Sequence, residues 1–177
     1  MQEEFQHNKR RAFSLKLQQR SGQLLIEAMV AISVMVIGLL GIFALLSQSL
    51  GLYHVAADQY VAANLAAEGI EVVKNILDAN FLKSGMAWNE GLAVDGAYGV
   101  NYNSTSLDSL LTNKNLLFDE TNKVYNYTTG RPTTFQRIIT IKNISPDEIQ
   151  VDSEVRWKTR GGLSSKISLE DHFYNWR

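Results

Sequence analysis

The residues of this chain that could do chemistry are few and scattered. It has 177 residues and no cysteine, which excludes a disulfide, a thiol nucleophile and a zinc–thiolate site. The three histidines are His7, His54 and His172, and no two of them stand at a spacing typical of metal ligands. The chain also lacks a phosphate-binding loop and a nucleophile elbow. The sequence therefore predicts no catalytic residue, no metal site and no cofactor, and we expect that the protein is not an enzyme.

One carboxylate stands in an unusual place. Glu27 lies four residues into an apolar segment, since residues 24–26 precede it and residues 28–46 follow it without a charge. In that run Ser33 is the only polar side chain. An ionised carboxylate inside lipid costs roughly 2.5–3.5 kcal/mol at mid-membrane, and less near the interface. Two explanations stay open: Glu27 lies at headgroup depth and remains hydrated, or a cationic partner is reserved for it.

The apolar segment around Glu27 is long enough to cross a membrane. Residues 28–46 alone make 19 residues, and a bilayer core needs about 20 apolar residues of helix. A secretory signal is the competing interpretation, but its apolar region usually has about 7–15 residues and a small-x-small cleavage site follows it. Here the run is longer, and residues 47–51 continue the helical pattern. We therefore expect a membrane-spanning helix.

The charges on the two sides of this segment differ in sign. Residues 1–22 contain five basic and two acidic residues, a net of 5 − 2 = +3, and the remainder contains 12 basic and 16 acidic residues, a net of 12 − 16 = −4. A basic stretch directly before an apolar run stays in the cytoplasm. We therefore expect a single-pass protein of the inner (cytoplasmic) membrane with its N-terminus inside and its head outside. The overall net charge of −1 gives no bulk attraction to nucleic acid, so no nucleic-acid partner is expected.

The residues around Glu27 also form a specific pattern. The segment Ser21-Gly22-Gln23-Leu24-Leu25-Ile26-Glu27 resembles the signal of type IV prepilins and pseudopilins. That signal has a basic leader, a glycine, a cleavage point, a variable residue, a short apolar stretch and a glutamate at the fifth mature position. The following helix is most similar to PilV-type pilus modification proteins and I-type minor pseudopilins. The resemblance covers residues 20–76 and extends weakly into the C-terminal strands.

This resemblance implies roles for three residues. Gly22 would end a basic leader, residues 1–22, that a membrane prepilin peptidase removes. Gln23 would become the N-terminus and would be N-methylated by the same enzyme, although Phe or Met is commoner at this position. Glu27 would guide assembly by pairing with the terminal amine of a neighbouring subunit. The implied partners are the prepilin peptidase, other pilin or pseudopilin subunits, and membrane lipid before assembly.

The helix is predicted to continue beyond the membrane segment. We expect residues 23–51 to form a transmembrane or filament-core helix and residues 52–177 to form a soluble head. Apolar positions recur at helical spacing on one face, at Val61, Leu65, Gly69, Val72 and Ile76. The helix is expected to reach about residue 80 and to stop between Asp78 and Gly85.

The rest of the head is predicted to form an antiparallel sheet. Residues 81–130 are a variable loop region with short strands expected at residues 98–102 and 124–127. Strands are expected between residues 135 and 170, because residues 149–157 alternate apolar and polar side chains and Gly161-Gly162 suits a hairpin. The expected fold is therefore α+β, with a small sheet packed on the distal half of the helix. This plan also resembles the pilin fold.

Three functions remain open from the sequence. The first is a minor pilin or minor pseudopilin, a structural subunit of a type IV pilus or a type II secretion-like filament at the cell surface or in the periplasm. The second is a filament-tip adhesin or DNA-uptake subunit that would use exposed tyrosines at positions 98, 102, 125 and 127, although a place in the strand core or in cross-strand pairs is the favoured interpretation of these residues. The third is an enzyme or sensor domain on an uncleaved anchor. Asp147 and Glu148 could bind calcium, but a turn is the favoured interpretation of these residues.

Overall fold

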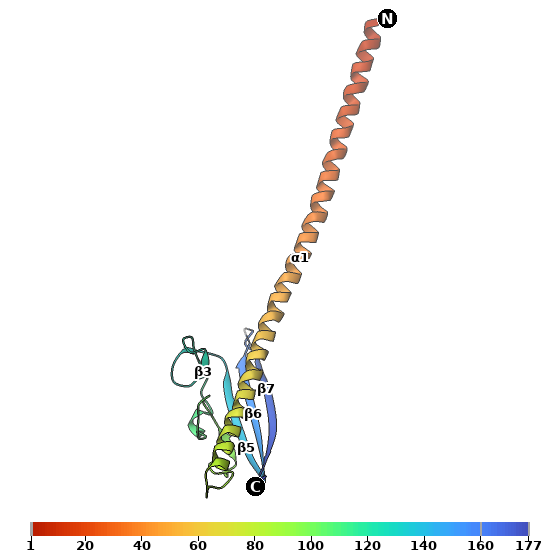
Figure 1. Ribbon diagram of the computed structural model, residues 1–177. Coiled ribbons are helices and arrows are strands. Elements are labelled where there is room, and N and C mark those ends of the chain that lie inside the picture. The colour runs from red at the N-terminus through yellow and green to blue at the C-terminus, as the bar shows by residue number, and fades with distance from the viewer. Residues whose placement is uncertain (1, 160, 177) are drawn as a thin grey trace. The chain divides into compact units, whose positions relative to one another are not determined.

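The computed structural model describes residues 2–159 and 161–176, with side chains from Gly22 onward. The chain divides into two compact units, Met1–Tyr53 and His54–Arg177. Helix α1 (Gln2–Leu82) makes up the described part of the first unit and continues into the second (Figure 1). Its end at Leu82 confirms the predicted stop between Asp78 and Gly85. An uninterrupted helix is possible because no proline occurs before Pro132.

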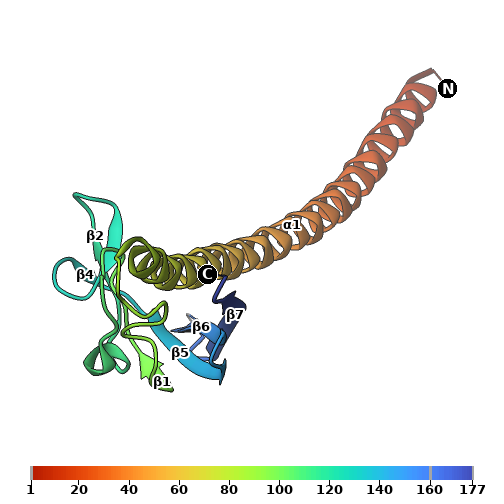
Figure 2. The ribbon, with the colours of Figure 1, turned by 60° about the horizontal axis from the view of Figure 1, so that its bottom comes forward.

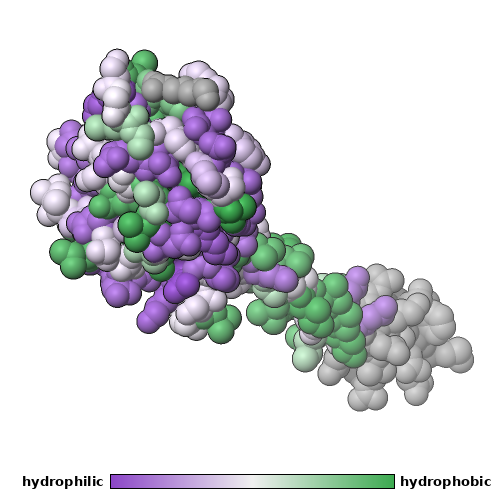
Figure 3. Space-filling model, turned by 90° about the horizontal axis from the view of Figure 1, so that it is seen from below, coloured by the Kyte–Doolittle hydropathy of each residue, from purple (hydrophilic) through white to green (hydrophobic). Residues whose placement is uncertain are grey.

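The first unit carries an exposed apolar surface. Within Gly22–Leu82 the helix contains a window long and apolar enough to cross a membrane, and none of that window is buried. Length and composition alone would equally suit a signal sequence near the N-terminus. In Figure 3 the helix next to the grey residues is nearly continuous green, whereas the surface of the second unit is largely purple and white with separate green spots. The surfaces of the two units therefore differ in polarity.

The main sheet of the second unit confirms the α+β prediction. It is antiparallel, with the strand order β1-β5-β6-β7 (Figure 2). Its strands are β1 (Gly96–Tyr98), β5 (Gln136–Ser145), β6 (Glu148–Lys158) and β7 (Ser164–Tyr174). The predicted alternation holds along β6, where Ile149 and Val151 are fully buried and the positions between them are partly exposed. Strand β7 runs four residues beyond residue 170, the expected end of the strands, and it pairs with β6 along its whole length.

Two buried clusters join the sheet to α1. One, the Trp157 cluster, holds Ala62, Leu65, Ala66, Leu116, Phe135, Val155 and Trp157. The other, the Trp88 cluster, includes Val72, Val73, Ile76, Leu77, Trp88, Ile139, Ile141, Ile149 and Val151. The helical stripe predicted from the sequence lies in or beside these clusters, with Leu65 and Val72 each 3% exposed. Burial of such a stripe is the main source of stability for a helix packed on a sheet.

A second, three-stranded sheet has two of its strands in the segment expected to be mainly loop, residues 81–130, and its third strand directly after it. Its order is β3-β2-β4, with β2 (Leu117–Asp119), β3 (Val124–Asn126) and β4 (Arg131–Pro132). A short 3-10 helix, Ser109–Leu111, precedes it. Strands of two or three residues are too short to show an alternating pattern, so only β3 was predicted. Gly130 has φ 124°, and a Cβ there would overlap the carbonyl of Phe118 across the β2–β4 pair.

The strand predicted for residues 98–102 is wrong over most of its length. Only Tyr98 belongs to β1, and Gly99 forms an isolated bridge with Asp108. The chain then turns, because the amide of Asn101 donates to Ser104 Oγ at 2.8 Å and the amide of Ser104 donates back to Asn101 O at 3.1 Å. A side-chain oxygen that accepts a local amide competes with strand pairing, which explains the early end of β1.

Candidate assembly site

The residues singled out by the sequence lie on one stretch of α1. Gln23 and Glu27 are four residues apart, so their side chains share a helix face. Together with Gly22 and Ile26 they line a shallow hollow on that face. All four are exposed, and a Cβ added at Gly22 would meet no atom within 4 Å. The backbone and side chains here are open to an approaching partner.

Glu27 stands in an apolar environment, without a counter-charge among the residues whose side chains the structure describes. Its carboxylate forms no hydrogen bond or ion pair with any residue from Gly22 onward that the structure describes. Large apolar side chains surround it along the helix, and Ile26 and Met29 are 65% and 63% exposed. So large an exposed apolar surface indicates contact with lipid or with other protein. In such surroundings an unpaired carboxylate is unfavourable and a cation is strongly attracted to it.

The four tyrosines considered for a binding face differ in their surroundings. Tyr125 and Tyr127 pack against the Trp157 cluster and Tyr98 packs against the Trp88 cluster. Burial raises the pKa of Tyr127 above its ordinary value, and its hydroxyl donates to the carbonyl of Arg137 at 3.4 Å. Tyr102 is the most exposed of the four, at 45%. Three of these rings thus contribute to the core of the head.

Asp147 and Glu148 act in a turn and in strand pairing. Asp147 accepts from Asn175 twice, at its carbonyl and at its carboxylate, which ties the C-terminal segment to the β5–β6 turn. Glu148 accepts from Tyr174 and contacts His172 on β7. No group of three or more metal-binding side chains occurs among the described residues. This geometry supports the turn interpretation.

Sequence reasoning missed Arg137, the fully buried charge of the head. Its guanidinium donates to three acceptors: Leu65 O at 3.0 Å, Glu68 at 2.8 Å and Val100 O at 2.7 Å. A signal was available, because Arg137 occupies an inward position of β5 between Phe135 and Ile139. A charge on the buried face of a strand requires partners, so it points to an anchor between elements.

The chain matches no protein-family model, no curated protein and no solved structure. Its class is therefore defined by architecture alone. Helix α1 is apolar and exposed in its N-terminal part and packs on an antiparallel sheet with its later part. This is a pilin-like architecture. The helix is long and apolar enough to cross a membrane.

Proposed function

We propose that this chain is the precursor of a minor pilin or minor pseudopilin. Its leader would be cut after Gly22, Gln23 would be N-methylated, and the apolar helix would then build the subunit into a filament. The observation that carries this proposal is Glu27, a carboxylate without a partner among the described residues, on a helix surface that is otherwise apolar and exposed. Residues 1–22, with a net charge of 5 − 2 = +3, precede it.

The physical argument rests on the cost of an isolated charge. In the membrane the Glu27 carboxylate is either drawn toward the headgroups or stays among the lipid tails. At the centre of the bilayer an ionised carboxylate raises the free energy of insertion by roughly 2.5–3.5 kcal/mol. Cleavage after Gly22 would create a terminal ammonium four residues away in sequence on every subunit. A terminal ammonium on a neighbouring helix offsets the free-energy cost of the Glu27 charge only when the two helices stand at one axial offset. The pair would therefore both attract the helices and fix their register.

A single substitution tests this proposal. Glu27→Gln keeps the size of the side chain and removes its charge, so we expect insertion and leader cleavage to persist while entry into sheared filaments is lost. Glu71→Gln is the matched control, because Glu71 is an exposed carboxylate of the head whose contact with Lys74 is 3.9 Å long. Filaments would be quantified by electron microscopy and by immunoblot of the sheared fraction. Normal amounts of the Glu27→Gln chain in filaments would exclude the proposed role.

The other two functions predict different results. An enzyme or sensor on a permanent anchor would keep residues 1–22 and would not depend on Glu27. A tip adhesin or DNA-uptake subunit would be processed like a pilin but would bind a ligand through its head. The packing of Tyr98, Tyr125 and Tyr127 against the core clusters gives this binding alternative less support than the sequence did.

A further inference from the structure

The face of the main sheet turned away from α1 carries two groups of opposite charge. Along β6 one set of side chains is buried against the helix, and the alternate set forms this outer face. At one end lies the basic group, defined as Arg156, Lys158 and Lys166. At the other end lies the acidic group, defined as Glu148, Asp152 and Glu170 on the strands and Asp147 in the β5–β6 turn beside them. The basic group adjoins the Trp157 cluster and the acidic group adjoins the Trp88 cluster.

Strand register places like charges opposite each other at both ends. Arg156 pairs with Lys166, and Asp152 pairs with Glu170. Like charges directly across two strands destabilise a sheet. Two such pairs on one face are therefore unfavourable for the isolated head, and each would be relieved by an opposite charge from outside.

Contacts within the head compensate the basic group only in part. Glu154, two residues before Arg156 on β6, bonds to Arg156 and to Lys166 on β7, the latter at 2.7 Å. Partial burial acts to raise the pKa of Glu154, but these hydrogen bonds outweigh it and the pKa lies below its ordinary value. Lys158 forms no ion pair with the part of the chain that the structure describes. Three cations and Glu154 leave 3 − 1 = +2 at this end.

The acidic group is also only partly compensated. His172 Nδ1 lies 2.7 Å from Glu148, and its Nε2 lies 3.4 Å from Glu170. Lys142 lines the shallow hollow that holds Asp152 and Glu170 but makes no ion pair with them within 4.0 Å. Four carboxylates with a protonated His172 and Lys142 leave −4 + 2 = −2, and a neutral His172 leaves −3.

The two groups are too far apart to neutralise each other. Asp152 and Arg156 are four residues apart on β6, about 14 Å at roughly 3.4 Å per residue. Exposed charges separated by more than about 8 Å are largely screened at physiological ionic strength. Each end therefore presents its own excess charge to a partner.

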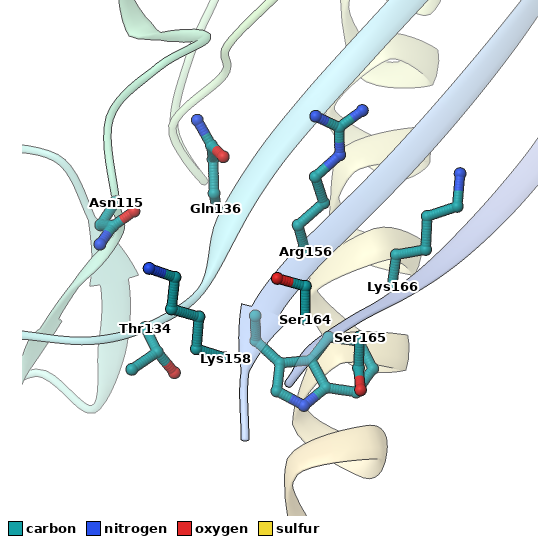
Figure 4. Close-up of a pocket in the computed structure, with 9 residues that line it drawn as sticks. Asn115, Thr134, Gln136, Arg156, Lys158, Ser164, Ser165 and Lys166 are labelled. Atoms are coloured by element: carbon teal, nitrogen blue, oxygen red, sulfur yellow. The ribbon is translucent and has the colours of Figure 1, made fainter. Parts of the chain in front are cut away.

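The basic end is also hollow. A hollow of about 610 Å³ is lined there by Asn115, Thr134, Gln136, Ser164 and the three basic side chains. In Figure 4 Gln136, Arg156 and Lys166 extend to the same side of the sheet, while Lys158 points toward Asn115. Ammonium, guanidinium, amide and hydroxyl groups are all hydrogen-bond donors, so this hollow suits carboxylates.

We infer that the basic group of one head binds the acidic group of a second copy of this chain, head to tail along the strands. The basic group and the acidic group are both present on the outer face of one chain, and their excess charges are opposite in sign. An anionic lipid surface would account for the basic group alone and would leave the paired carboxylates Asp152 and Glu170 unexplained. The inference rests on the proposed function in one respect, because it assumes that two copies of this chain meet during assembly.

Disulfide trapping in the full chain tests this contact, because the native sequence has no cysteine. Ser145→Cys marks the turn beside the acidic group, and Ser164→Cys marks the basic hollow; both positions are exposed. The two variants, carrying tags of different mass, would be reconstituted together in phosphatidylcholine vesicles and oxidised. We expect the mixed 145–164 cross-link to exceed the 164–164 cross-link at least fivefold. Equal yields would overturn the inference.

Charge reversal then identifies the attraction. Lys158→Glu with Lys166→Glu in the Ser164→Cys copy should reduce the mixed cross-link about tenfold. Asp152→Lys with Glu170→Lys in the Ser145→Cys copy should do the same, and combining the two reversed copies should restore it. Restoration also shows that the reversed heads are folded. Lys74→Glu, an exposed reversal on α1 outside both groups, is the matched control and should leave the yield unchanged.

Three further outcomes are decisive. Reversed copies that never restore the cross-link, although circular dichroism shows them folded, would overturn the inference. So would a cross-link that needs phosphatidylglycerol and ignores reversal of the acidic group. A chain with both cysteines should give a ladder of oligomers, and dimers alone would exclude the head-to-tail arrangement.

The two proposals can fail separately. If the reversed copies do not restore the cross-link but filaments still depend on Glu27, the head-to-tail contact is excluded and the proposed function stands. If the reversed copies restore the cross-link but filaments form without Glu27, only the proposed function is overturned.

Discussion

The Arg137 guanidinium on β5 lies 2.8 Å from the Glu68 carboxylate on α1, across 69 positions of sequence. Arg137 is fully buried, while the Glu68 side chain is 35% exposed. The same guanidinium donates to Leu65 O and Val100 O, so one side chain joins the helix, the sheet and the loop after β1. Its Nε has no hydrogen-bond partner among the described residues. This contact links the part of α1 that belongs to the head with the head's main sheet.

Replacing Arg137 should destabilise the head strongly. Arg137→Met keeps a long apolar stem but removes the guanidinium that donates to Leu65 O and Val100 O. Breaking a buried charged contact typically costs about 3–5 kcal/mol, and we expect about 3 kcal/mol here because the exposed part of Glu68 can rehydrate. Urea unfolding of the full chain in detergent, followed by far-UV circular dichroism, would measure this change.

The matched control is Glu71→Gln, which removes an exposed ion pair from the same helix. Such pairs contribute about 0–1 kcal/mol, so its unfolding midpoint should stay near that of the native chain. An Arg137→Met chain that unfolds at the same urea concentration as Glu71→Gln would contradict the anchoring role.

At Gly69 helix α1 lies close against side chains of the sheet. A Cβ at this position would overlap Ser153 Oγ and lie 2.7 Å from Ile139 Cδ1. Gly69→Ala should therefore destabilise the head by about 1–3 kcal/mol, the usual range for overpacking, although alanine is the better helix former by roughly 1 kcal/mol. Thermal unfolding would measure the change.

A second variant tests the cause of that loss. Adding Ser153→Ala to Gly69→Ala removes the overlapping oxygen and should recover part of the stability. Gly51→Ala serves as the control, since a Cβ there meets nothing within 4 Å, and it should not lower stability. If Gly51→Ala and Gly69→Ala behave alike, the close approach does not limit packing.

The His172 imidazole should titrate above its ordinary range. The hydrogen bond with Glu148 is the main cause, and Glu170 adds to it, so the pKa of His172 is raised above about 6.5. A raised pKa in the folded state means that the contribution of the pair to stability is complete below pH 6.5 and is lost as the pH rises through the folded value. NMR titration of the ring protons should show this, and Glu148→Gln should lower the pKa more than Glu170→Gln does.

The pH dependence of stability gives a separate readout for this pair. The difference in unfolding midpoint between the native chain and Glu148→Gln should be largest near pH 5.5 and should shrink at pH 8.5. A difference that grows with pH would have the wrong sign for a histidine with a raised pKa and would refute the assignment.

Processing at Gly22 predicts a defined N-terminal peptide. Mass spectrometry of the membrane-extracted protein should find a peptide that begins at Gln23 and carries one added methyl group, because methylation keeps the amine cationic for Glu27. An N-terminal glutamine can instead cyclise with loss of ammonia to a neutral lactam. A dominant lactam would argue against pairing with Glu27, and an intact leader would favour a permanent anchor.

The sequence by itself determined the local features of this protein. The apolar run, the basic residues before it and the place of Glu27 within it can be read from hydropathy and charge, which need no knowledge of the fold. The helix beyond it and the alternation on β6 follow from periods of 3.6 and 2 residues. Leu82 ends the helix where the polar and glycine signals predicted, and Val151 and Val155 point inward as their spacing required.

Only the tertiary structure decided which distant residues meet. The bond from Arg137 to Glu68, the overlap that forbids a side chain at Gly69, and the register that sets Asp152 beside Glu170 all join separate elements. Such contacts depend on how the strands align and how closely the helix approaches the sheet. A one-residue shift of register would turn every side chain to the opposite face, and no local period in the sequence fixes that choice.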